Sequence, residues 1–152
     1  MYNKARPRRF TVFCVTMLVT APLWAQMPQP PQGEPLSFVG MTLNELFERF
    51  GTPASVYTAR GEENWQDDVV FVYNEGDFFI YRNRVWQIGL KSLYGMKIGD
   101  AKAVALLTLG DEAQDAGNYL LCNLSGFGWP LSLRVSLSDG KVSAIYVYRP
   151  DY

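Results

Sequence analysis

The chain has 152 residues, 48% of them hydrophobic and 14% aromatic, which suits a folded globule of one domain or two small units sharing a core. Its formal net charge is −1, and four of its basic residues lie in the first ten positions. The rest of the chain has 10 basic and 15 acidic residues and is therefore mildly acidic. Such a charge balance does not suit binding to nucleic acid. Histidine is absent, which removes the commonest general base and the commonest metal ligand.

The N-terminus has the pattern of a secretory signal. Basic residues within positions 1–9 precede an apolar run over residues 10–24, and small residues stand at Ala21 and Ala25. The apolar run is shorter than a membrane-spanning helix requires and is interrupted by polar residues and a proline. The alternative is that the segment is retained as an N-terminal anchor. We therefore expect residues 1–25 to be a signal peptide, and the protein to be exported to the periplasm or beyond the cell, with no stable membrane span in the mature chain.

A proline- and glutamine-rich stretch follows, over residues 26–36. Such a composition favours extended, polyproline-like backbone and cannot pack a core. We expect it to be a spacer between the signal and the folded part.

Two later segments, residues 39–53 and 98–110, share one outline. In each, eleven positions separate an opening from a closing glycine, and apolar residues between them fall on one helical stripe. Thr42 and Asp100 are the predicted N-caps of these helices. The glycines predicted to end them are Gly51 and Gly110.

Strand-like runs follow each predicted helix. In the first half they are residues 69–73, 78–81 and 85–90, and in the second half residues 119–124, 131–138 and 141–149. The predicted fold class is therefore α+β. It consists of two tandem units, residues 37–92 and 93–152, each a helix plus a three-stranded antiparallel meander, with the helices packed on one face of the sheet or sheets.

The first helical segment resembles a known family. Gly40-Met41-Thr42 and, after an amphipathic stretch, Phe50-Gly51-Thr52-Pro53 are similar to the opening of the SmpA/OmlA (BamE-like) outer-membrane assembly proteins. The tandem arrangement resembles the β-lactamase inhibitor protein. These resemblances imply a periplasmic or secreted protein that binds other proteins. The chain departs from the assembly proteins in lacking an anchoring cysteine, so the matched residues are carried over as fold determinants only: Gly40, Met41, Thr42, Gly51 and Pro53.

Enzyme chemistry finds little support. Cys122 is the one thiol after the predicted signal, and its leucine neighbours indicate a buried strand residue; a nucleophile is the alternative, but no histidine is present to activate it. No Gly-x-Ser-x-Gly, P-loop or Cys-x-x-Cys motif occurs. The acidic residues 111–115 lack calcium-loop spacing. We expect no catalysis, cofactor or metal, and a hydrolase using carboxylates and Cys122 is the weakest hypothesis.

Six residues are candidates for partner binding. Phe127 and Trp129, in a glycine-rich loop, are aromatic anchors in one interpretation and core residues of a bulge or wide turn in the other. Tyr146 and Tyr148 share one strand face, where they line a binding surface or have no task. The remaining two are Arg82 and Arg84, which flank a turn and clamp an anionic group or solvate a hairpin tip.

The functional prediction is a non-catalytic exported protein-binding module of the bacterial cell envelope, with an envelope or secreted protein as its partner. The alternative is a carrier of a small ligand or lipid, with an apolar pocket between the helices and the sheet.

Overall fold

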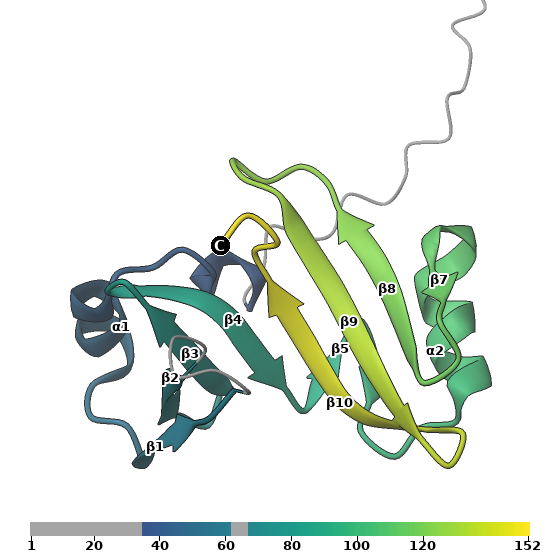
Figure 1. Ribbon diagram of the computed structural model, residues 1–152, viewed down its shortest axis with the longest axis horizontal. Helices are drawn as coiled ribbons and strands as arrows, with labels where there is room; N and C mark the ends of the chain where they lie inside the picture. Colours follow the sequence, from purple (N-terminus) through teal and green to yellow (C-terminus); the bar gives the residue numbers. More distant parts are fainter. Residues whose placement is uncertain (1–34, 62–66) are drawn as a thin grey trace, which may run out of the picture.

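The computed structural model describes residues 35–61 and 67–152, and these form a largely antiparallel β structure with two short α-helices (Figure 1). The predicted signal peptide, residues 1–25, and the spacer up to residue 34 lie outside the described residues. Within them, no helix has the length and apolar character that crossing a bilayer requires.

One eight-stranded antiparallel sheet organises the molecule, in the spatial order β1-β2-β3-β4-β10-β9-β8-β7. Its first half holds β1 (Ser55–Ala59), β2 (Asp68–Val72), β3 (Asp77–Tyr81) and β4 (Arg84–Leu90). Its second half holds β7 (Gln114–Asp115), β8 (Tyr119–Leu124), β9 (Leu131–Ser138) and β10 (Lys141–Tyr148). A small separate hairpin, β5 (Ser92–Leu93) and β6 (Met96–Lys97), connects the halves.

The predicted fold of two tandem helix-plus-three-stranded units is wrong. Each half carries a fourth strand, β1 or β7, and β4 pairs with β10 so that all eight strands belong to one sheet. The pairing sets Ile88 opposite Val147 and Leu90 opposite Ile145. The physical reason is that β4 and β10 would otherwise be long, apolar edge strands with unpaired backbone groups. The predicted boundary between residues 92 and 93 falls inside β5.

Helix α1 (Leu43–Phe50) follows a 3₁₀ turn, η1 (Leu36–Phe38), and begins at the predicted N-cap. The amide N of Glu45 donates to Oγ1 of Thr42 (3.3 Å), and the amide N of Thr42 donates to Oε2 of Glu45 (2.7 Å), which is a complete capping box. Gly51, with φ +71°, ends the helix in a conformation that glycine adopts readily.

Helix α2 (Lys102–Leu109) begins one residue later than predicted, after Ala101, and has no side-chain cap. Asp100 is not its N-cap. Its Oδ2 instead accepts a hydrogen bond from the amide N of Lys97 (2.9 Å), closing the turn that follows β6. A 3₁₀ turn, η3 (Gly110–Glu112), continues from the C-terminus of α2.

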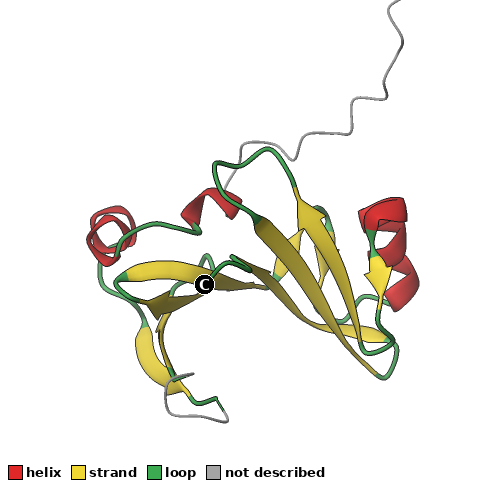
Figure 2. Cartoon of the chain, turned by 45° about the horizontal axis from the view of Figure 1, so that its top comes forward, coloured by secondary structure: helices red, strands yellow, loops and turns green. Residues whose placement is uncertain are grey.

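The core lies between the helices and one side of the sheet (Figure 2). One row of cross-strand neighbours runs along this side through seven strands: Val56, Phe71, Phe78, Ile88, Val147, Leu133 and Cys122. Helix α1 packs on the row through ring contacts of Phe47 with Phe71 and of Phe50 with Phe78. Helix α2 adds Ala105, which is fully buried in the same core.

Side chains one position along each strand point to the other side of the sheet. One row there contains Tyr57, Val70, Phe79, Gln87, Tyr148, Ser132 and Asn123, and the next contains Gly89, Tyr146, Arg134 and Leu121. We call this side, with its aromatic members Tyr57, Phe79, Tyr146 and Tyr148, the open face. It lies opposite the side on which α1 and α2 pack. Tyr57 on this face is exposed, Phe79, Tyr146 and Tyr148 are half-buried, and Val70 and Ser132 are buried.

Candidate functional site: an aromatic sheet face and an arginine-lined pocket

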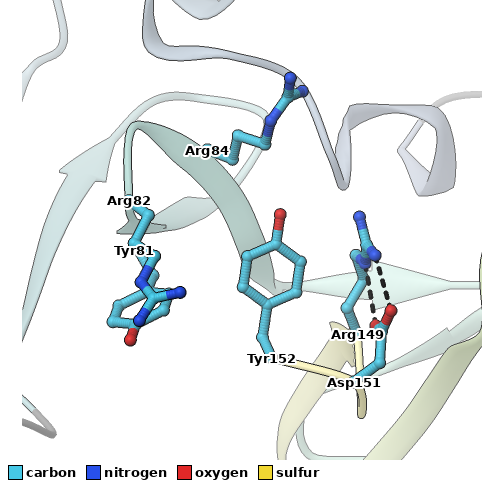
Figure 3. A pocket seen from close by; sticks show the side chains of 6 residues that line it. All are labelled: Tyr81, Arg82, Arg84, Arg149, Asp151 and Tyr152. Carbon is cyan, nitrogen blue, oxygen red and sulfur yellow. Dashed lines mark hydrogen bonds and ion pairs between the residues drawn. The ribbon is translucent and has the colours of Figure 1, made fainter.

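An open pocket of about 520 Å³ lies where β3 ends, β4 begins and the chain leaves β10 (Figure 3). We call it the arginine pocket, since three guanidinium groups line it. Its residues are Tyr81, Arg82, Arg84, Arg149, Asp151 and Tyr152. It therefore brings the two predicted arginines together with residues far from them in the sequence.

The β3–β4 turn positions Arg82 and Arg84. Arg82 and Asn83 both have positive φ, +47° and +65°, as the central residues of a tight two-residue hairpin turn require. Arg82 thus stands exposed at the tip, with its guanidinium carbon 5.1 Å from the centroid of the Tyr81 ring. Arg84 begins β4, and its Nη1 donates to the carbonyl O of Gly40 (2.9 Å). This bond ties the turn to the segment that precedes α1.

The opposite wall of the pocket is formed by residues after β10. Nε and Nη2 of Arg149 donate to the two carboxylate oxygens of Asp151, at 3.0 and 2.6 Å. This bidentate pair lowers the pKa of Asp151 and raises the pKa of Arg149. The Arg149 guanidinium carbon also lies 4.5 Å from the ring centroid of Tyr152, which stands between this pair and Tyr81 in Figure 3.

Trp129, in the loop between β8 and β9, lies beside the pocket. Its ring is 5.2 Å from the Arg149 guanidinium carbon and is 41% exposed. It also lies on Gly40, where an added Cβ would come within 2.6 Å of Cζ2 of Trp129. Phe127, predicted in the same loop, packs partly buried against the core. Trp129 and the two arginines therefore lie in one region, and Phe127 does not.

The open face begins beside the pocket. Phe79 and Tyr81 stand two positions apart on β3 and therefore point to the same side of the sheet. The ring centroid of Tyr81 lies 6.1 Å from that of Tyr152. The ring of Phe79 meets that of Tyr146 edge to face at 6.1 Å. Tyr146 passes close over Gly89, where an added Cβ would lie 3.3 Å from its Cε1. One aromatic pair therefore lies at the pocket and a second lies on β3 and β10 further along the sheet.

Two further residues extend this face. Tyr57 on β1 is 45% exposed, and partial burial raises the pKa of its hydroxyl, helped by Asp77 and Tyr146. Tyr148 is half-buried, in the row that contains Gln87 and Ser132. The predicted pair Tyr146 and Tyr148 therefore lies on the open face.

Cys122 is 6% exposed, and burial, together with Glu112, raises the pKa of its thiol. A raised pKa keeps the thiol protonated at neutral pH, whereas a nucleophilic cysteine needs a lowered one. Among residues 35–61 and 67–152, no group of three or more Cys, Asp or Glu side chains is arranged to hold a metal ion. The chemistry of the region is that of guanidinium groups and aromatic rings, which bind anions and flat or apolar groups.

Sequence reasoning missed six residues of this region: Tyr57, Phe79, Tyr81, Arg149, Asp151 and Tyr152. The alternation along residues 77–81 carried a usable signal, because it puts Phe79 and Tyr81 on one side of a strand. Nothing comparable existed for Arg149 and Tyr152. Their place depends on β10 pairing with β4.

Comparison with known proteins found no matching family model and no matching curated protein. Two solved structures are similar in part. A cysteine-rich secretory protein from Staphylococcus aureus subsp. aureus Mu50 is 16% identical with a TM-score of 0.49, over 82% of this chain and 48% of that chain. An extracellular protein containing a SCP domain from Bacillus anthracis str. Ames is 12% identical with a TM-score of 0.44, over 83% and 49%. The chain spans about half the length of each.

The resemblance to the SmpA/OmlA family and to the β-lactamase inhibitor protein is wrong. One eight-stranded sheet, in which β4 pairs with β10, replaces the small separate units that the resemblance implied. The matched residues perform local tasks: Gly40 has φ +97°, Thr42 caps α1 and Gly51 ends it. Such tasks recur at the ends of unrelated helices, so fifteen residues of pattern did not identify the family.

Proposed function

We propose that the protein is a non-catalytic exported binding module, and that its partner is an envelope or secreted protein that contacts the open face and the arginine pocket. The observation that carries the proposal is a pair of aromatic ring contacts, Tyr81 with Tyr152 and Phe79 with Tyr146, whose β3 members stand two positions apart, with guanidinium groups lining the pocket beside the first pair. Tyr, Trp and Arg are the residues that most often dominate the energy of protein interfaces.

Export, with the periplasm as the favoured destination, is supported by the basic and apolar pattern of residues 1–25. The absence of catalysis is supported by the lack of histidine and by the raised pKa of the Cys122 thiol. Both stay predictions.

We rank the ligand-carrier alternative lower because side chains fill the space between α1 and the sheet. Phe38, Leu46 and Phe78 are each no more than 1% exposed, and the rings of Phe38 and Phe50 meet edge to face at 5.0 Å. A carrier of apolar ligands needs an apolar cavity. The arginine pocket, which lies where β3 ends, β4 begins and the chain leaves β10, is instead lined by guanidinium groups and tyrosine rings.

Site-specific photo-cross-linking in the organism that makes the protein tests the proposal. A photoreactive phenylalanine analogue replaces Tyr57 on the open face or, as the matched control, Leu107 on α2, which is 86% exposed. We expect protein adducts from position 57 and none of the same mass from position 107. A Tyr146→Ser substitution should remove the position-57 adducts. Adducts from position 107 alone would contradict the proposal.

A further inference from the structure

We infer that the arginine pocket binds a carboxylate side chain on an acidic segment of the protein partner. The inference rests on the proposed function, since it assigns the partner's chemistry at one end of the same surface. It starts from an imbalance among the lining side chains: three of them carry guanidinium groups, and one, Asp151, carries a carboxylate.

The carboxylates near the pocket are already engaged. Asp151 is held by both donors of the bidentate pair with Arg149. Glu45, which lies near enough to Arg84 to feel its charge, is committed first to Thr42 through the capping box. Arg149 is therefore neutralised, and Arg82 and Arg84 are the cations left to face an incoming anion.

These two arginines keep donors for a ligand. Arginine has five N–H donors in a planar fork, and Arg84 gives one of them to the carbonyl O of Gly40. Arg82 makes a ring contact with Tyr81, and no hydrogen bond or ion pair engages it within the described residues. Stacking on a ring orients a guanidinium group and leaves the N–H groups at its edge free. Carboxylate oxygens accept hydrogen bonds from these N–H groups.

The surroundings favour an acidic protein segment over an anionic membrane or a free anion. Membrane surfaces are recognised by clusters of about four to eight basic residues, whereas this pocket has two available cations in a mildly acidic body. Its walls carry Tyr81 and Tyr152, and Trp129 lies beside it, so that aromatic surface surrounds the charge. A free phosphate would use none of that surface, while a peptide can cover it and continue along the open face.

Fluorescence anisotropy with the exported protein tests this inference. The probes are a fluorescein-labelled ten-residue peptide of alternating tyrosine and glutamate, and the same peptide with glutamine in place of glutamate. We expect the glutamate probe to bind about tenfold more tightly, because each charge-assisted contact is stronger than a neutral one. The difference should shrink as salt is added. Equal binding of the two probes would overturn the inference.

Three variants locate the binding. Arg82→Glu should abolish the preference for the glutamate probe, and Arg82→Lys should weaken it, because an ammonium lacks the planar fork. The matched control, Lys141→Glu, makes the same change of charge at the far end of β10 and should leave the preference unchanged. The pocket assignment fails if Arg82→Glu and Lys141→Glu behave alike, or if millimolar inorganic phosphate displaces the probe completely.

The two experiments separate the inference from the function on which it rests. Cross-links from position 57 that survive Arg82→Glu at full yield would leave the binding module standing and remove the acidic partner. A glutamate preference without any cross-link from position 57 would retain the pocket and remove the partner protein.

Discussion

The segments that precede α1 and α2 meet the sheet through the same backbone hydrogen bonds. Before α1, the amide N of Gly40 donates to the carbonyl O of Val85 (2.7 Å), and the amide N of Val85 donates to Met41 (2.8 Å). Two residues after Met41, the amide N of Leu43 donates to the carbonyl O of Asn83 in the β3–β4 turn (3.1 Å). The first turn of α1 is thus fixed to a hairpin before any helix–sheet packing is considered.

The segment before α2 repeats these bonds on the β9–β10 hairpin. The amide N of Gly99 donates to Val142 (2.8 Å), that of Val142 to Asp100 (2.8 Å), and that of Lys102 to Gly140 (2.8 Å). The likeness is local, because β4 and β10 pair with each other and the two halves share one sheet.

The side chains of the two helices differ at the same places. Where α1 has Thr42 and Glu45 in a capping box, α2 has Ala101 and Val104 and no side-chain cap. On its outer surface α2 presents Leu107, which is 86% exposed. The comparison teaches that backbone pairing with a hairpin is enough to position a short helix start, and that a side-chain cap adds stability to it.

The largest difference between the two starts should come from their glycines. Gly40 and Gly99 both have positive φ, +97° and +94°, but an added Cβ at Gly40 meets Trp129 at 2.6 Å and one at Gly99 meets nothing within 4 Å. We expect Gly40→Ala to lower the free energy of unfolding by about 2–4 kcal/mol and Gly99→Ala by about 1–2 kcal/mol. Urea unfolding measures both, and equal losses would show that Trp129 yields without cost.

A smaller effect should follow from exchanging the caps. Thr42→Ala removes a capping side chain and should cost about 1 kcal/mol of unfolding free energy. Ala101 has the extended backbone of an N-cap (φ −66°, ψ 148°), so Ala101→Thr should gain about 0.5 kcal/mol; the gain is smaller because Val104 offers no reciprocal carboxylate. Urea unfolding again decides. A loss of stability in Ala101→Thr would refute this account of α2.

The smallest effect should be the pH dependence of the α1 cap. Hydrogen bonds from Thr42 hold the pKa of Glu45 below its ordinary value of 4.5. A lowered pKa in the folded state means that the charged form contributes stability above pH 4.5, and that this contribution is lost as the pH falls through the folded pKa. The Tm deficit of Glu45→Gln at pH 7 should therefore shrink as the pH falls below 4.5 and vanish once the pH lies below the folded pKa of Glu45. A deficit that persists there would assign the effect to packing.

Much of the local structure could be predicted from the sequence. The α1 cap at Thr42 and the stop at Gly51 are set by neighbours in the chain, so a local pattern contains the information. The strand runs were found for the same reason. The start of α2 was predicted one residue early. Asp100 is a good N-cap by residue type, but its carboxylate accepts a hydrogen bond from the amide N of Lys97, which precedes it in the chain. The strand β7 was missed because it has only two residues, and β1 was missed because it is largely exposed and so lacks the alternation of a half-buried strand.

The residues of the candidate site likewise divide into those that a local pattern predicts and those that it does not. Arg82, Arg84, Tyr146 and Tyr148 were identified from turns and alternation, which have a range of a few residues. That Arg82 and Arg84 line one pocket with Arg149 and Tyr152 follows from the register between β4 and β10, strands separated by about fifty residues of sequence.

By itself the sequence determined the helix segments, most of the strands and the strand faces on which tyrosines lie, because these follow from spacing and backbone preferences over short distances. The tertiary structure alone decided that both halves form one sheet, that Trp129 rests on Gly40, and that three arginines share a pocket with Tyr152. These depend on contacts between distant segments, whose choice among many possible pairings is made by burying the whole core at once.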